Sequence, residues 1–324
     1  MTTQEPFAQM RFADLPGVPR LPHPFFDVPE TRVTVQSAHF GAITLSVRRH
    51  GAGPPLLVVH GLMTSSYSWR YVLEPLAARF EVIAFDLPGA GRSDAPDVAY
   101  GPRELADLIG ELMDTLGVCG APVIGNSMGG YLSMWLALRR PSALSRLVNL
   151  HSPGVVTPRM TALELALRVP YSGALLDRLI HRDPLRWAFK NVHYYDESLK
   201  SLEEAHEYGA PLSTKEGRSA FHRYLRDTMS ATAMKELAKA LRALPGGRFP
   251  VPLKLIYARR DPMVPPEVGA RLAALIPSAE LVWLERGSHL AHVDAPEAFL
   301  EAALPFLLAS SRAGPPTLTP SAVD

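Results

Sequence analysis

Gly125-Asn126-Ser127-Met128-Gly129 is the stretch of sequence that decides the fold. It fits the pattern Gly-x-Ser-x-Gly and lies between an apolar run, 121–124, and a helix-forming run, 131–140. A strand, a sharp turn and a helix in this order lift a serine hydroxyl clear of a sheet, and small flanking residues let backbones approach closely. The pentapeptide therefore predicts that Ser127 is a nucleophile. The alternative is a structural turn whose serine only caps the helix.

The size and charge of the chain narrow the class of protein. Its 324 residues are enough for a large core and one or two domains. The formal net charge of +1 gives no sign of binding to nucleic acid or to an anionic membrane. Cys119 is the only cysteine, so no intramolecular disulfide can form. Without a secretory signal or a run of about 18 apolar residues, we expect a cytoplasmic protein with no stable membrane insertion.

Short apolar runs alternate with helical patterns in two parts of the chain. The expected strands are 31–37, 43–49, 56–59, 82–85, 123–124, 147–150, 253–257 and 281–284. The expected helices between them are 69–79, 103–116, 131–140, 266–276 and 296–308. Alternating strands and helices indicate a mostly parallel sheet that is covered on both faces.

The alternation stops between about residues 154 and 244, where helical patterns dominate and no convincing strand is found. The expected helices there are 161–169, 173–181, 184–192, 215–228 and 231–244. We therefore expect four parts in the chain. They are a Pro-rich arm (1–30), an α/β core (31–153 and 245–310), a helical cap (154–244) and a flexible tail (311–324).

A base and an acid are expected beyond two late strands. A serine hydroxyl needs a base within hydrogen-bond reach and a third group that orients the base. His289 follows the run 281–284, at the carboxyl end of a strand, where open α/β sheets place functional groups. We assign His289 as the base. His292 is the competitor, and its other interpretation is a histidine on the surface or supporting the site from behind.

Asp261 is the candidate for the orienting acid. It follows the run 253–257, in a loop stiffened by neighbouring prolines. The alternative interpretation is an ion pair of Asp261 with Arg259 or Arg260. The run 147–150 is followed by no carboxylate, which favours Asp261.

An oxyanion hole requires backbone N–H groups aimed at the developing charge. We expect one from Met128, the residue after the nucleophile, and one from Leu62, in the loop after the run 56–59. His60 lies in the same loop, and we interpret it as a brace for that loop.

The motifs together resemble the α/β-hydrolase superfamily over about residues 33–308. They are His60-Gly61, the segments 86–93 and 125–130, Asp261 with Val264-Pro265, and His289 followed by Asp294, Pro296 and Glu297. The resemblance implies a mostly parallel eight-stranded sheet flanked by helices, an inserted helical cap, and a triad in the order Ser127, Asp261, His289. Ser288 stands where such proteins usually have glycine, and Asp294 where they usually have glutamate.

Two narrower resemblances bear on the substrate. Residues 64–70 resemble a loop of haloalkane dehalogenases and epoxide hydrolases, but these enzymes have aspartate where this chain has Ser127. A serine forms an acyl-enzyme, which argues against both activities. Residues 125–130 also resemble meta-cleavage-product hydrolases, which break carbon–carbon bonds. In those enzymes the loop after the His-Gly pair is glycine-rich, whereas here it reads Leu62-Met63-Thr64. Arg186 resembles their substrate-binding arginine only loosely.

The sequence thus predicts a serine hydrolase that cleaves an apolar carboxylic ester of small to medium size through an acyl-enzyme, with no cofactor, no metal and no nucleic-acid partner. Some apolar cap residues are expected to line an acyl or aromatic pocket; the candidates are Leu163, Leu165, Leu167, Val169, Leu175, Leu176, Leu179, Ile180, Trp187, Phe189, Tyr194 and Tyr195. The alternatives are carbon–carbon bond hydrolysis and a ligand receptor with little turnover. The sequence leaves the oligomeric state open.

Overall fold

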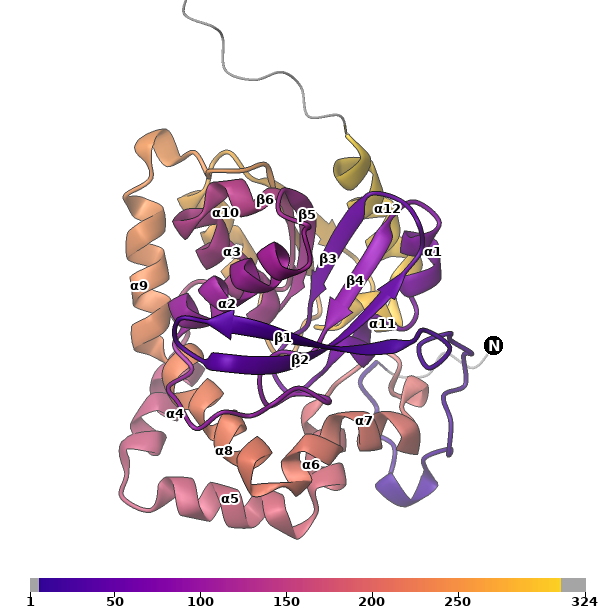
Figure 1. The fold of residues 1–324 in the computed structure, drawn as a ribbon. Helices are drawn as coiled ribbons and strands as arrows, with labels where there is room; N and C mark the ends of the chain where they lie inside the picture. Colours follow the sequence, from indigo (N-terminus) through magenta and orange to yellow (C-terminus); the bar gives the residue numbers. More distant parts are fainter. Residues whose placement is uncertain (1–5, 310–324) are drawn as a thin grey trace, which may run out of the picture.

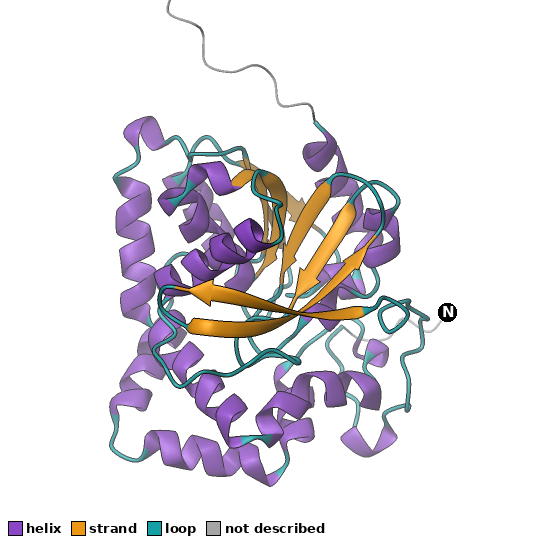
Figure 2. Ribbon diagram, viewed as in Figure 1, coloured by secondary structure: helices purple, strands orange, loops and turns teal. Residues whose placement is uncertain are grey.

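The computed structural model describes residues 6–309, and an eight-stranded sheet runs through its centre (Figures 1 and 2). The spatial order is β1-β2-β4-β3-β5-β6-β7-β8, and only the pairs β1–β2 and β2–β4 are antiparallel. The strands are β1 (Glu30–Ser37), β2 (Gly41–His50), β3 (Pro55–Val59), β4 (Glu81–Phe85), β5 (Ala121–Asn126), β6 (Leu144–Leu150), β7 (Leu253–Ala258) and β8 (Glu280–Leu284). The predicted mostly parallel eight-stranded sheet is confirmed.

Helices cover both faces of this sheet and bury two apolar clusters. One face carries α2 (Pro102–Thr115), α3 (Met128–Arg139) and α10 (Pro266–Leu275), and the other carries α1 (Leu73–Ala77), α11 (Ala291–Asp294) and α12 (Pro296–Leu308). Successive residues of β3 alternate between the clusters: Leu57 and Val59 belong to the first, and Leu56 and Val58 to the second. Burial on both faces explains why this strand is wholly apolar.

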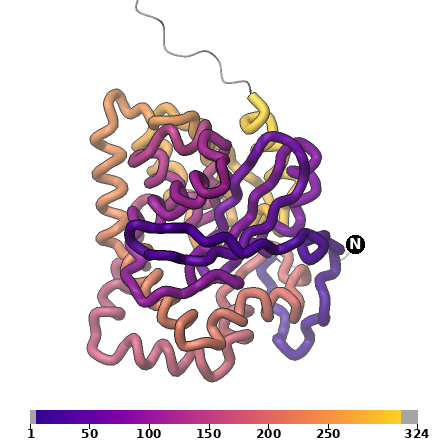
Figure 3. Tube along the Cα trace, viewed as in Figure 1, coloured from indigo at the N-terminus to yellow at the C-terminus, as the bar shows by residue number. Residues whose placement is uncertain are grey.

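The chain between β6 and β7 is helical and contains no strand; we call residues 151–252 the helical insertion. Its helices are α4 (Pro158–Arg168), α5 (Ser172–Arg182), α6 (Pro184–Asn191), α7 (Leu202–Ser213), α8 (Lys215–Arg223) and α9 (Ala231–Arg242). A π-helical turn, Tyr224–Thr228, follows α8. The tube in Figure 3 shows α4 to α8 gathered beyond one end of the sheet, while α9 runs back along the core.

One helix prediction was wrong, and two helices were missed. The expected helix 69–79 is a 3₁₀ turn, Ser66–Trp69, followed by α1, which begins only at Leu73. Pro75 lacks the N–H that would bond to residue 71, so it is tolerated in the first turn of α1 but not in a longer helix. Helix α7 and the four-residue α11 were not predicted.

The N-terminal arm packs against both the core and the helical insertion. Phe25 of the arm is 1% exposed, in the second apolar cluster. Further along, the backbone N–H groups of Leu202 and Glu203 donate to the carbonyls of Pro16 (2.8 Å) and Gly17 (3.0 Å). The arm thereby adds backbone hydrogen bonds at the start of α7. The predicted tail, 311–324, lies outside the described residues.

Candidate active site

Ser127 lies at the junction between β5 and α3, in a backbone conformation that non-glycine residues seldom adopt. Its φ and ψ are 53° and −118°. The Ser127 N–H donates to the Leu150 carbonyl of the neighbouring strand β6 (2.8 Å), which helps to hold this turn. Backbone strain of this kind is concentrated at functional sites and persists only where the surroundings enforce it.

The glycines on either side of Ser127 leave no room for a side chain. A Cβ atom at Gly125 would lie 2.5 Å from the Gly130 Cα, and one at Gly129 would lie 2.2 Å from the Val59 carbonyl oxygen. The first contact lets β5 turn directly into α3, and the second lets α3 pack against the end of β3. The Gly-x-Ser-x-Gly spacing is therefore a packing requirement of the turn.

His289 and Asp261 are brought together at the carboxyl ends of β7 and β8. His289 Nδ1 and Asp261 Oδ2 are 2.7 Å apart. The other carboxylate oxygen of Asp261 accepts the backbone N–H groups of Met263 (2.7 Å) and Val264 (2.9 Å). Burial works to raise the pKa of Asp261, but the charge and hydrogen bond of His289 outweigh it and the pKa falls below its ordinary value. An ionised carboxylate here orients the imidazole.

The ion pairs considered as the alternative for Asp261 do not form. Arg259 binds Glu285 instead (2.7 Å), and the Arg260 guanidinium lies over the Tyr195 ring, 5.9 Å from its centroid. The loop between β7 and α10 therefore presents its carboxylate inward and its two arginines outward.

Two residues that the sequence analysis did not assign to the site contact His289. Asn126 bonds to its backbone, and His151 packs beside its ring. Asn126 Nδ2 donates to the His289 carbonyl (3.0 Å). The buried ring of His151 lies 5.7 Å from the His289 ring, and its Nε2 accepts the N–H of Ala258 (2.6 Å). Burial, with the His289 charge adding to it, lowers the pKa of His151 to about 4. His151 therefore stays neutral near pH 7 and adds no charge beside the pair.

His292 is not on the surface, so of its two other interpretations only a histidine that supports the site from behind remains. It is fully buried, and its ring lies 4.2 Å from the Trp69 ring, centroid to centroid. Burial holds the pKa of His292 well below its ordinary value. Within the described residues its two ring nitrogens have no hydrogen-bond partner, and it lies outside the lining of the cavity that holds His289.

The loop after β3 carries Leu62, and His60 is placed to brace it. His60 Nε2 accepts the N–H of Leu87 (2.9 Å), so its proton lies on Nδ1, 2.8 Å from the Gly61 carbonyl oxygen. Leu62 borders the same cavity as Ser127. Met128 is the first residue of α3, where a backbone N–H has no partner inside the helix.

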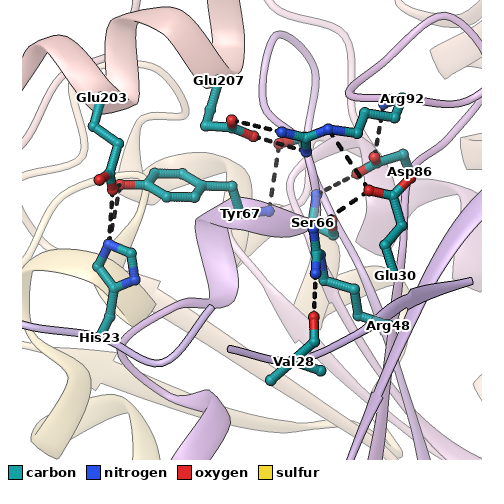
Figure 4. Close-up of polar contacts among 11 residues, drawn as sticks. His23, Val28, Glu30, Arg48, Ser66, Tyr67, Asp86, Arg92, Glu203 and Glu207 are labelled. Atoms are coloured by element: carbon teal, nitrogen blue, oxygen red, sulfur yellow. Dashed lines mark hydrogen bonds and ion pairs between the residues drawn. The ribbon is translucent and has the colours of Figure 1, made fainter. Parts of the chain in front are cut away.

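Charged residues connect the loop after β3 with the loop after β4 and with α7 (Figure 4). Asp86, at the end of β4, accepts the N–H groups of Ser66 (2.8 Å) and Arg92 (2.9 Å). The Arg92 side chain then binds Glu207 of α7 (2.9 Å). Helix α7 is thus attached to the core by ion pairs close to the loop that carries Leu62.

A cavity of about 780 Å³ opens between the core and the helical insertion, and both Ser127 and His289 border it. Its walls are mainly apolar. Seven of the twelve pocket candidates line it, namely Leu163, Leu167, Val169, Leu175, Leu176, Leu179 and Trp187. The other five candidates do not line it; they are Leu165, Ile180, Phe189, Tyr194 and Tyr195. Arg159 and His193 are among the polar residues at its border.

No cluster of three or more His, Cys, Asp or Glu side chains suited to a metal ion occurs among residues 6–309. Within the same residues, no helix is both long and apolar enough to cross a membrane.

Comparison with known proteins identifies the family. The model of the alpha/beta hydrolase fold family matches residues 54–296, so the chain belongs to this family and is a hydrolase. It is 30% identical to the uncharacterized hydrolase YugF of Bacillus subtilis, over 76% of this chain and 87% of that protein. It is 28% identical to 2-hydroxymuconate semialdehyde hydrolase of Pseudomonas sp. strain CF600, over 78% and 86%.

A solved structure supports the same fold. A thermophilic esterase from Thermogutta terrifontis superposes with a TM-score of 0.67 at 22% identity, covering 86% of this chain and 98% of the esterase. At this identity the likeness concerns the fold alone.

Proposed function

We propose that the protein is a serine hydrolase that cleaves carboxylic esters through an acyl-enzyme. The observation that carries the proposal is the 2.7 Å pair of His289 Nδ1 and Asp261 Oδ2, on the same cavity as the strained Ser127 turn. An ionised acid, an imidazole and a serine hydroxyl are the three parts that acyl transfer requires. The apolar walls of the cavity suit the acyl part of an uncharged ester.

In the proposed reaction, the Ser127 hydroxyl oxygen bonds to the ester carbonyl carbon while His289 Nε2 takes its proton. Asp261 holds the imidazole through Nδ1 and stabilises the imidazolium. The N–H groups of Leu62 and Met128 bind the oxyanion of the tetrahedral intermediate. As that intermediate collapses, the alcohol leaves with the proton from His289. A water molecule, deprotonated by His289, then attacks the acyl carbon, releases the acid and restores the Ser127 hydroxyl.

Covalent labelling tests the nucleophile. A fluorophosphonate probe should label the wild-type protein and the control Ser142→Ala, whose serine is exposed and far from the cavity, but not Ser127→Ala. Turnover of p-nitrophenyl butyrate should follow the same pattern. Label that remains on Ser127→Ala, or ester turnover that Ser127→Ala leaves unchanged, would refute the mechanism. Labelling without turnover on any ester would favour the receptor alternative.

Carbon–carbon bond hydrolysis is the second candidate, supported by the 28% identity to 2-hydroxymuconate semialdehyde hydrolase. Arg186 does not support it, because its side chain pairs with Asp183 (3.3 Å) and does not border the cavity. Arg159 does border the cavity and could bind a substrate carboxylate. Turnover of a dienoic keto-acid that is lost in Arg159→Gln, with esters left uncleaved, would favour this candidate.

A further inference from the structure

Helices α4 and α5, joined by a short loop, lie at the outer edge of the molecule (Figure 1), and we call them the α4–α5 hairpin. They leave large apolar side chains in solvent. Among the described residues, nine large hydrophobic side chains are exposed, and five of them lie in this hairpin. They are Leu165, Val169, Tyr171, Leu175 and Leu179, with exposed fractions between 43% and 88%. Helix α4 has no buried residue, and α5 buries only Ile180. Five such residues within fifteen positions form a patch, whereas singly scattered ones would need no explanation.

The patch is continuous with the cavity that Ser127 borders. Leu175 and Leu179 are spaced by four residues in α5, so they lie on one face of this helix, and Tyr171 is the residue directly before it. These three and Val169 belong both to the exposed patch and to the cavity lining, so they mark its mouth. Leu165 lies on the outer side only, because it is exposed but does not border the cavity.

Basic residues are frequent in the segment that carries the patch. Between residues 158 and 190 there are six Lys or Arg residues, namely Arg159, Arg168, Arg178, Arg182, Arg186 and Lys190, all of them exposed. Only three acidic residues lie in this segment. Glu164 pairs with Arg168 (2.6 Å) and Asp183 with Arg186 (3.3 Å), whereas Asp177 pairs with the buried Arg218 of α8 (2.6 Å). The whole chain has 33 basic and 32 acidic residues, so its net charge conceals this local excess.

We propose that the α4–α5 hairpin docks reversibly on an anionic lipid surface, with the cavity mouth facing the lipid. An apolar stripe bordered by basic residues is the combination that binds in the plane of a bilayer, through burial of apolar area and attraction to anionic headgroups. The near-zero net charge did not indicate such a surface. The distribution of the charges along the chain does. Docking in this mode inserts no helix across the membrane.

The docked orientation extends the proposed function to a substrate class. An ester with a long acyl chain could pass from the lipid through the mouth at Val169, Tyr171 and Leu175 without crossing water. This second part rests on Ser127 being the nucleophile. The docking itself does not depend on the identity of the nucleophile. The variant Ser127→Ala should therefore bind lipid as the wild-type protein does.

Vesicle co-sedimentation tests the docking. The full chain should bind vesicles of phosphatidylcholine mixed with phosphatidylglycerol, bind phosphatidylcholine alone more weakly, and lose part of the difference at high salt. The variant Leu165→Ser with Arg178→Gln should reduce the affinity for the mixed vesicles on the order of tenfold, because it removes one apolar and one cationic contact. Neither residue borders the cavity, so turnover of a water-soluble ester should stay unchanged.

The matched control is Leu308→Ser with Arg79→Gln. Leu308 is also exposed (51%), at the end of α12, and Arg79 is an exposed arginine after α1, both on parts of the molecule far from α5 (Figure 1). This control should bind vesicles as the wild-type protein does.

Three outcomes would overturn the proposal: no vesicle binding by the wild-type protein, equal losses in the variant and the control, or a dimer in light scattering that the Leu165→Ser/Arg178→Gln variant abolishes. The last would assign the patch to a second copy of the chain. If vesicles bind while the fluorophosphonate fails to label Ser127, the docking stands and the proposed function falls.

Discussion

At the scale of single residues, Asp261 is the side chain with the most specific surroundings. Its two oxygens accept from one imidazole and two backbone N–H groups, and it is almost fully buried. The His289 contact keeps its pKa below the ordinary value despite burial. A group arranged in this way holds a ring in one tautomer rather than exchanging protons itself.

Asp261→Asn should therefore reduce kcat for a soluble ester by about 10³- to 10⁴-fold while leaving the fold intact, because the amide can hold His289 in the wrong tautomer. Steady-state kinetics with p-nitrophenyl butyrate measure the loss, and circular dichroism checks the fold. Glu285→Gln is the control, since it removes a carboxylate of the same region that binds only the exposed Arg259. A similar loss in both variants would remove Asp261 from the proposed triad.

The sequence predicted the three candidate residues of the site but not what holds them. Ser127, Asp261 and His289 each follow a recognisable strand, so their positions could be read from local patterns. Asn126 and His151 act on His289 across 163 and 138 positions of sequence, and no local pattern encodes such a contact. The burial of His292 could not be predicted for the same reason, because Trp69, which packs against it, is far away in the sequence.

At the scale of elements, the turn between β5 and α3 depends on the close approach of α3 to β3. Gly129 is the point of contact, beneath the Val59 carbonyl. The helix can start immediately after Ser127 only because no side chain separates these two backbones.

Gly129→Ala should destabilise the protein by about 3 kcal/mol or prevent folding, since the added methyl group overlaps backbone that cannot move aside. Urea unfolding followed by fluorescence gives the change. At Gly17, φ is not positive and nothing lies within 4 Å of an added Cβ, so Gly17→Ala should stay within about 0.5 kcal/mol of the wild-type protein. Equal stability of the two variants would show that the turn relaxes.

Helix α7 was the longest element that the sequence analysis missed, although a start signal was present. Ser201 and Glu204 have the spacing of a capping box, and the Ser201 hydroxyl accepts the Glu204 N–H (3.1 Å). The Glu204 side chain, however, binds Arg70 and Tyr194 instead of the helix start. Leu202, Ala205, Tyr208 and Leu212 do have helical spacing, but Gly209 and Pro211 between them are the residues least favourable to a helix.

At the scale of the whole molecule, a buried ion pair joins the core to the helical insertion. Arg70, which follows the 3₁₀ turn after β3, binds Glu204 of α7 (2.6 Å), and their side chains are 0% and 4% exposed. The Arg70 guanidinium is also enclosed by the rings of Tyr67 and Tyr71. Since the arm also bonds to the start of α7, three distant segments meet around this helix.

Glu204→Leu should lower the free energy of unfolding by about 3–5 kcal/mol, because it leaves the buried Arg70 charge without its anionic partner. The comparison is Asp107→Leu, which breaks a solvent-exposed pair with Arg139 at nearly the same distance (2.7 Å) and should cost less than about 1 kcal/mol. Denaturant titration of both variants measures the difference. Losses of equal size would mean that burial adds nothing to the Arg70–Glu204 contact.

The helical insertion leaves the sheet after β6 and returns at β7, two strands that are direct neighbours. Ser127, Asp261 and His289 all lie outside it, as do Leu62 and Met128. The insertion nevertheless supplies most of the cavity wall. Recombining residues 155–244 with the corresponding segment of a relative would thus exchange the binding surface while the reacting groups keep their supports, which makes this chain a natural starting point for chimeric enzymes.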